Sequence, residues 1–170
     1  MSRQEELYLF LHEKTAIIFK YLIKNGANPR DAEDIIQEAL YKFILYIDSV
    51  DPNKAYSWLF RVAINQYYDL CRKQQKEVNV SFEDFDLVDD SFLPEEYVQQ
   101  TEMKKEIYNI LNRLSPLHKQ LLLLKYVLGL SYKEIAQMLD LNPGTLKTYL
   151  FRARQSFKKL YEEEGKHDRD

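Results

Sequence analysis

The chain has 170 residues, of which 45% are hydrophobic and 30% charged, with only 4 glycines and 5 prolines. This length suits two domains of about 70 residues each, and the scarcity of helix breakers favours an all-α fold over a sheet-rich one. No apolar run approaches the ~20 residues of a membrane-spanning helix, and the N-terminal sequence lacks the features of a secretory signal. With one cysteine, Cys71, an internal disulfide is excluded. We therefore expect a cytoplasmic protein without direct membrane insertion.

The net charge of −3 is the sum of three different regions. Residues 1–76 carry 11 basic and 10 acidic side chains, residues 77–102 carry 9 acidic and no basic ones, and residues 103–170 carry 13 basic and 8 acidic ones. The middle region lacks a sustained hydrophobic period, and we interpret it as an acidic linker between two helical domains. Because this linker sets the overall sign, the net charge does not exclude a nucleic-acid-binding protein.

The first domain, residues 1–76, is predicted to be a bundle of three helices with apolar residues at helical spacing. The first helix is expected over residues 3–24, and Asn25-Gly26 marks its end. Asn28-Pro29 begins the second helix, with asparagine as N-cap and proline in the first turn. A polar loop then leads to a third helix over residues 55–76.

The second domain is expected over residues 103–165, with a short charged tail at 166–170. After two helices separated at Ser115-Pro116, the sequence Ser131-Tyr132-Lys133-Glu134 predicts a capping box, in which the serine caps the glutamate amide and the glutamate reaches back. Asn142-Pro143 begins the last, long helix. A short capped helix, a tight turn and a second helix predict a helix-turn-helix.

The last helix carries five basic residues and no acid between positions 141 and 161. Polar, basic and aromatic residues recur at helical spacing on the face opposite the apolar stripe, so one DNA groove can meet them together. Arginine reads guanine edges, and threonine contacts bases or phosphates. The alternative is a solvated basic face on an ordinary bundle helix, but the absence of acids favours DNA.

Three motifs resemble extracytoplasmic-function sigma factors of the sigma-70 family, in the family's order. The first comprises Leu130-Ser131-Tyr132-Lys133-Glu134-Ile135-Ala136, Gly144-Thr145-Leu146-Lys147-Thr148 and Phe151-Arg152-Ala153-Arg154, and is similar to region 4, which recognises the −35 promoter element. Tyr149 departs from the family, where a basic residue is common. The resemblance implies −35 contacts from the following residues: Thr145, Lys147, Thr148, Phe151, Arg152, Arg154 and Lys158.

The second motif, residues 31–40, resembles region 2.2, which docks on core RNA polymerase. The resemblance assigns this role to Asp31, Asp34, Gln37 and Glu38. The alternative for these residues is a solvated N-terminal turn whose acids are favoured by the helix dipole.

The third motif, residues 56–63 followed by Asn65, Asp69 and Arg72, resembles region 2.4, which opens the −10 element. Aromatic rings stack on unstacked bases, and cations hold phosphates. The predicted −10 contacts are Lys54, Tyr56, Trp58, Arg61, Asn65 and Arg72. Trp58 alternatively belongs to the core, and Asp69 is expected to pair with Arg61 or Arg72.

The resemblance implies a sigma factor that binds core RNA polymerase and promoter DNA, with an anti-sigma factor as a further partner. The acidic linker either imitates a nucleic-acid backbone or is merely solvated. Two other functions stay open: a free-standing helix-turn-helix repressor, and a helical adaptor that binds only protein. The sequence predicts no enzyme: its three histidines lie far apart, and it has no glycine-rich phosphate loop. No metal, cofactor or small-molecule substrate is expected.

Overall fold

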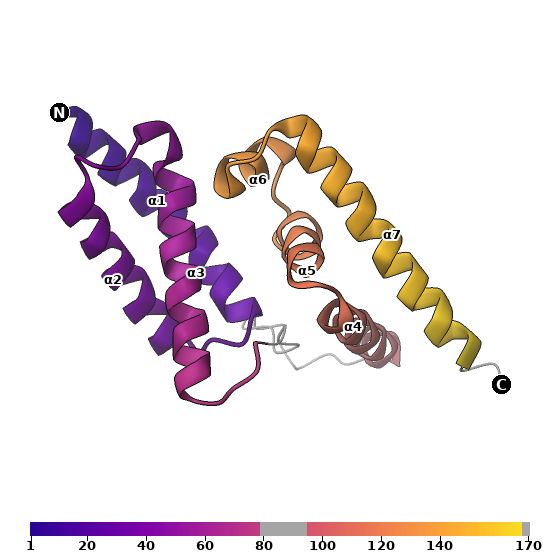
Figure 1. Cartoon of the computed structure of the whole chain (residues 1–170). Coiled ribbons are helices and arrows are strands. Elements are labelled where there is room, and N and C mark those ends of the chain that lie inside the picture. Colours follow the sequence, from indigo (N-terminus) through magenta and orange to yellow (C-terminus); the bar gives the residue numbers. More distant parts are fainter. Residues whose placement is uncertain (79–94, 168–170) are drawn as a thin grey trace.

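The computed structural model describes residues 1–78 and 95–167, with side chains given except at 95–101 and 167. Within these residues every regular element is helical. The predicted all-α fold is therefore confirmed, and Figure 1 shows the helices as two groups, one from each half of the chain.

The first group is a three-helix bundle in which each long helix packs against the other two. Its elements are α1 (Arg3–Lys24), α2 (Pro29–Tyr46), the short 3-10 helix η1 (Pro52–Lys54) and α3 (Ala55–Lys73). The first helix has the predicted bounds, and the second begins at Pro29 as predicted. Helix α3 ends three residues before the predicted position 76, because Gln75 adopts a left-handed backbone with φ of 52°.

Local hydrogen bonds explain where these helices begin and end. Ser2 and Glu5 form a full capping box at the start of α1, which the sequence analysis did not identify. The Asn28 side chain accepts a hydrogen bond from the Asp31 amide at 2.8 Å, as expected of an N-cap. Between the two helices Gly26 has a φ of 98°, a conformation that glycine adopts readily.

The second group comprises α4 (Glu95–Arg113), α5 (Pro116–Leu122), the π-helical turn η2 (Leu123–Val127), α6 (Tyr132–Leu139) and α7 (Pro143–His167). Helix α4 begins at Glu95, so the last part of the segment predicted as a linker is helical. Of the rest of that linker prediction, residues 77 and 78 have no regular structure, and residues 79–94 lie outside the described residues, as do residues 168–170. Helices α6 and α7 form the predicted helix-turn-helix.

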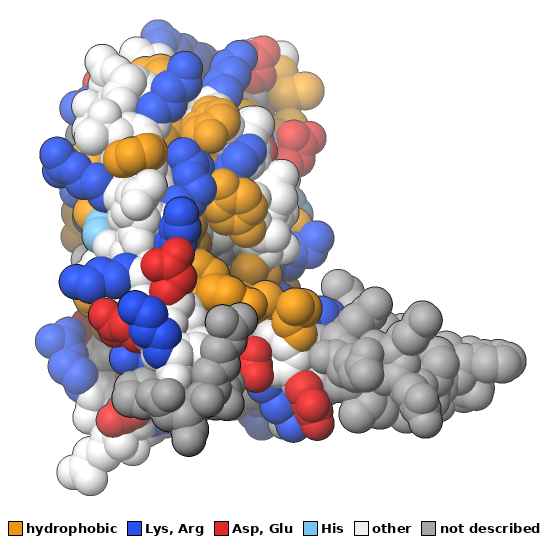
Figure 2. All heavy atoms as spheres, turned by 90° about the vertical axis from the view of Figure 1, so that its right-hand side faces the viewer, with side chains coloured by type: hydrophobic (Ala, Val, Ile, Leu, Met, Phe, Trp, Pro, Cys, Tyr) orange, Lys and Arg blue, Asp and Glu red, His pale blue; other side chains and the backbone are white. Residues whose placement is uncertain are grey.

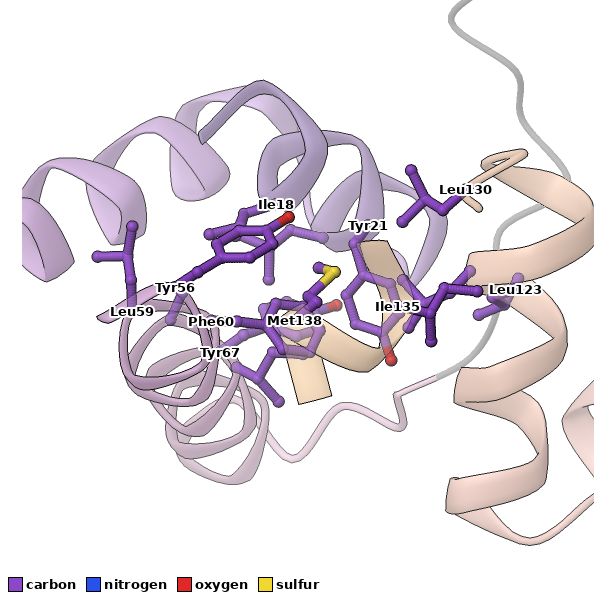
Figure 3. Packing of buried hydrophobic residues seen from close by; sticks show 14 of the residues in the cluster. Ile18, Tyr21, Tyr56, Leu59, Phe60, Tyr67, Leu123, Leu130, Ile135 and Met138 are labelled. Atoms are coloured by element: carbon purple, nitrogen blue, oxygen red, sulfur yellow. The ribbon is translucent and has the colours of Figure 1, made fainter. Parts of the chain in front are cut away.

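The two groups are joined through α6, which packs against α3 of the first domain and against α7 of its own. Its Ile135 and Met138 side chains are both 0% exposed. Figure 3 shows them between Tyr56 and Phe60 of the first domain and Leu123 of the second. Except for Ile110, the described buried hydrophobic residues of both domains consequently form one continuous cluster.

We predict that Phe43→Ala lowers the free energy of unfolding by about 3–5 kcal/mol, because it empties a fully buried site beside the Trp58 ring, 5.9 Å away between centroids. Tyr41→Ala on the same helix is the control: this side chain is 61% exposed, and the change should stay within about 0.5 kcal/mol. Urea unfolding followed by circular dichroism measures both. If both substitutions lower the free energy of unfolding equally, the face of α2 that carries Phe43 does not contribute to the core.

Candidate nucleic-acid interface

Helix α7 begins with a compact turn that orients its outer face. Asn142 precedes the helix, and its Oδ1 accepts a hydrogen bond from the Gly144 amide at 2.8 Å. A Cβ on residue 144 would lie only 3.2 Å from that oxygen, so glycine suits the position. Leu146, Leu150 and Ala153 are fully buried against the domain, and the opposite side of α7 therefore faces solvent.

The solvent side of α7 carries most of the predicted −35 residues together. Lys147, Thr148, Phe151 and Arg152 are all exposed, and Figure 2 shows lysine and arginine side chains over the upper part of this face with hydrophobic ones between them. Lys158 is exposed further along the helix, whereas Thr145 is half-buried at the edge. We call the exposed residues Lys147, Thr148, Phe151 and Arg152 the α7 face.

Arg154 lies apart from the α7 face. Its Nη1 donates a hydrogen bond to the Tyr126 hydroxyl at 3.1 Å, which raises the pKa of the guanidinium above its usual range. It stands at the edge of an apolar groove between α4, the α5–η2 segment and α7, where Leu111, Leu122 and Phe157 also line the wall. The structure thus groups Arg154 with the groove rather than with Arg152.

A cleft of about 500 Å³ brings together three of the predicted −10 residues, Lys54, Trp58 and Arg61. It lies at the N-terminal end of α3, and Asp140 of the second domain also lines it. Trp58 is half-buried, so it belongs both to the core, through Phe43, and to the cleft wall.

Asn65 and Arg72 line a different hollow, further along α3, together with Asp69. Arg72 pairs with Asp69, as the sequence analysis predicted for this acid. The six predicted −10 residues are therefore not gathered at one site.

Tyr56 is buried in this structure, so a DNA base outside the protein cannot reach its ring. Tyr56 is 2% exposed, beneath α6, and its hydroxyl has no hydrogen-bond partner among the residues that the structure describes. Burial raises the pKa of Tyr56 well above its usual range, and the Glu134 carboxylate raises it further. Tyr56 was predicted as a −10 contact, whereas in this structure it is part of the contact between the two domains.

The polymerase-binding residues predicted on α2 lie on the outer side of the bundle. Asp34, Gln37 and Glu38 are exposed, whereas Asp31 is half-buried and accepts a hydrogen bond from the Asn28 side chain at 2.9 Å. Glu38 also contacts Gln66 and, at 3.6 Å, Lys42.

Within the next two turns of α2 after Glu38, the same stripe becomes apolar, with Tyr41 61% and Leu45 60% exposed. Sequence reasoning missed this extension, although positions 34, 38, 41 and 45 follow the alternating spacing of four and three that keeps residues on one helix face. We call Asp34, Gln37, Glu38, Tyr41 and Leu45 the α2 stripe.

The predicted capping box at the start of α6 is only half correct. The Ser131 hydroxyl accepts a hydrogen bond from the Glu134 amide at 3.1 Å, as expected. The glutamate does not reach back: its carboxylate accepts from Lys14 Nζ on α1 at 2.9 Å. A partner in the other domain competes successfully for this side chain, since an ammonium is a stronger donor to a carboxylate than an amide.

Comparison with known proteins places the two halves in one family. Residues 15–77 match the family model for sigma-70 region 2, and residues 104–157 match that for sigma-70 region 4. The ECF RNA polymerase sigma factor SigM of Bacillus subtilis is 32% identical over 146 residues, which is 85% of this chain and 88% of the relative. The chain belongs to the ECF RNA polymerase sigma factors.

A second Bacillus subtilis relative, SigW, is 32% identical over 84% of this sigma factor and 81% of the relative. Among solved structures, CnrH in complex with the cytosolic domain of CnrY has a TM-score of 0.56 at 18% identity, with 95% of this chain and 91% of that chain covered. RpoE in complex with the anti-sigma factor NepR from Bartonella quintana has a TM-score of 0.55 at 21% identity, covering 93% and 98%. These likenesses confirm the fold.

Membership of the family settles the general activity of this protein. As a sigma factor, it binds core RNA polymerase and directs it to promoters for transcription initiation. Among residues 1–78 and 95–167, no group of three or more His, Cys, Asp or Glu side chains is arranged to hold a metal ion. No helix in these same ranges has the length and apolar character needed to span a membrane.

Proposed function

We propose that this sigma factor divides its work among three surfaces: the α2 stripe binds core RNA polymerase, the cleft beside Trp58 holds the −10 element, and the α7 face reads the −35 element. The observation that carries this assignment is the α7 face itself, an exposed set of basic, hydroxyl and aromatic side chains on the second helix of a helix-turn-helix. The basic test is transcription from a promoter library with purified core polymerase and this protein.

The α7 face supports direct reading of duplex DNA because its residues differ in their place along the helix. Arg152 is one turn from Thr148, in the N-terminal half of α7, the half of a recognition helix that meets base edges. Lys158 is almost two turns further on, where the helix leaves the groove. The first position suits a base contact, and the second suits a phosphate contact.

Arg152→Ala should weaken promoter binding by about 1–3 kcal/mol and relax the preference at one −35 base pair. Lys158→Ala, the matched control on the same helix, should weaken binding evenly across sequences and reduce its salt dependence slightly. The measurement is holoenzyme binding to promoters mutated one base pair at a time, at two salt concentrations. If both variants weaken all promoters equally, α7 attaches to DNA without reading it.

The α2 stripe supports a protein partner because it combines acids with exposed apolar side chains. Asp34 and Glu38 offer charge to a basic helix, while Tyr41 and Leu45 offer apolar area next to it. Monomeric proteins seldom expose large apolar side chains side by side without an interaction to serve. The stripe is accessible in this structure, since the side chains of Asp34, Gln37, Glu38, Tyr41 and Leu45 are all exposed.

We expect Asp34→Arg with Glu38→Arg to weaken core polymerase binding about tenfold or more, since both charges would then repel a basic partner. The control is Glu6→Arg with Glu13→Arg on α1, which makes the same charge change at exposed positions of the same domain. Competition against labelled wild-type protein gives the affinities, and circular dichroism checks folding. The assignment fails if the two double variants bind polymerase equally well.

The cleft supports a −10 role because it places an aromatic wall beside two cations. Trp58 offers a stacking surface, and Lys54 and Arg61 can hold phosphates on either side of an unstacked base. Its size, about 500 Å³, is that of a small-ligand site and admits one nucleobase.

Arg61→Ala should reduce promoter opening about tenfold, the value of one charge-assisted hydrogen bond, while leaving −35 binding intact. Lys73→Ala, an exposed cation at the other end of α3, is the control and should have little effect. Permanganate reactivity of unpaired thymines measures opening, and a gel shift measures total binding. If Arg61→Ala reduces total binding as much as it reduces opening, Arg61 has no role specific to opening.

An anti-sigma factor as partner, and a cytoplasmic location, belong to the same proposal. Promoter DNA and core polymerase are cytoplasmic in bacteria, and the two solved structures named above are both complexes with a bound regulator or cytosolic domain. Co-purification of this protein with core polymerase, and its displacement by a co-expressed regulator, tests both points.

A further inference from the structure

The carboxylate of Glu38, a member of the α2 stripe, is held by donors from two helices. Gln66 on α3 donates a hydrogen bond from its Nε2 to one carboxylate oxygen, Oε2. Lys42, one turn further along α2, places its Nζ 3.6 Å from the other oxygen, Oε1. Helices α2 and α3 pack side by side in the first domain (Figure 1). Glu38 consequently presents its charge from a defined position, although 54% of its side chain is exposed.

The two donors act on Glu38 in different ways. Lys42 is positively charged, so it attracts the carboxylate but also repels any basic partner that approaches it. Its side chain is 43% exposed, and an exposed ion pair between two flexible side chains is weak. The Gln66 amide is neutral and half-buried, on a helix of the packed bundle. Gln66 therefore fixes the carboxylate without cancelling its charge.

Packing alone does not explain a glutamine at position 66. While its Nε2 faces Glu38, its Oε1 is buried and has no hydrogen-bond partner among the residues that the structure describes. A buried acceptor without a partner is destabilising, because it has lost its hydrogen bonds to water. Turning the amide around would set Oε1 against the carboxylate, and neither group could then donate. A methionine would fill the same space without an unpaired acceptor.

A fixed carboxylate binds a basic partner more tightly than a freely rotating one. Glutamate is among the side chains that lose most rotamer freedom when they become ordered. If Gln66 orders the Glu38 side chain in the free protein, that entropy is lost on folding and not on binding. Gln66 can thus strengthen binding without touching the partner.

We infer that Gln66 is a positioning residue for core polymerase: from α3, it holds the Glu38 carboxylate of the α2 stripe in the orientation that a basic surface of polymerase meets. The inference rests on the proposed function of the α2 stripe. Because Gln66 acts through Glu38 alone, its contribution to polymerase binding should disappear when residue 38 has no charge to offer.

A double-mutant cycle on the full-length protein tests this dependence. The variants are Gln66→Met, Glu38→Gln and the two together, and competition against labelled wild-type protein for core polymerase gives the affinities. Glu38→Gln should weaken binding about fivefold, through the loss of one interface charge. Gln66→Met should weaken it about threefold, within the range for ordering one long side chain. Added to Glu38→Gln, it should cause no further loss.

Two matched controls use the neighbours of Glu38. Asp34→Asn neutralises the other acid of the stripe and leaves the Gln66–Glu38 hydrogen bond in place, so in this background Gln66→Met should still weaken binding about threefold. Lys42→Gln removes the second donor to Glu38 together with its positive charge, and it should not weaken binding.

Two further measurements separate positioning from a structural or DNA-binding role of Gln66. Because methionine removes the unpaired acceptor, the urea midpoint of Gln66→Met should not fall below that of the wild type. In transcription with core polymerase, Gln66→Met should raise the sigma concentration for half-maximal activity about threefold and leave the activity at saturation unchanged. A role of Gln66 in promoter opening would instead lower the activity at saturation.

The inference is overturned if Gln66→Met has no effect on polymerase binding, or weakens it as much in the Glu38→Gln background as in the wild type. It is also overturned if Lys42→Gln causes the same loss, or if Gln66→Met lowers the urea midpoint or the activity at saturation. Failure of the proposed function looks different. If Glu38→Gln and Asp34→Asn each bind polymerase like the wild type, the α2 stripe is not the polymerase-binding surface.

Discussion

The burial of α6 between two domains is the constraint on which the rest of the structure depends. Domains of about 70 residues bury thin cores, and an eight-residue helix has little stability of its own. Ile135 and Met138 lose all their exposure only because both domains contribute atoms around them. The position of α6 then fixes where α7 begins, which way its exposed face points, and which residues Glu134 and Asp140 meet.

The contact between the two domains combines an apolar centre, Ile135 and Met138, with the ion pairs Lys14–Glu134 and Lys54–Asp140 at its edge. These two parts contribute different amounts of free energy. Burying an aliphatic side chain is worth about 1.5–3 kcal/mol, whereas a solvent-exposed ion pair contributes only about 0–1 kcal/mol. The apolar centre therefore supplies most of the attraction, and the charges select the orientation.

Most of the fold could be predicted because its signals are local. Asn28, Ser131 and Asn142 each mark a helix start within a few residues, and hydrophobic spacing identifies the buried sides. The start of α4 was missed because acids and little periodicity look like a linker, although acids also suit a helix N-terminus. The partner of Glu134 could not be predicted, since Lys14 is 120 residues away in sequence, and the same long-range packing buries Tyr56.

The segregation of charge along the chain makes its attraction to DNA depend on distance. At distances beyond the Debye length of about 8–10 Å, DNA meets a protein whose net charge is −3, and attraction is weak. The five cations of residues 141–161 have no acid among them in sequence. They attract DNA strongly only when it is close to this helix. A surface of this kind binds DNA well when something else brings it close, and poorly when it must find DNA by diffusion. Under the function proposed above, a sigma factor held on polymerase by its first domain is in the first situation, and the free chain is in the second.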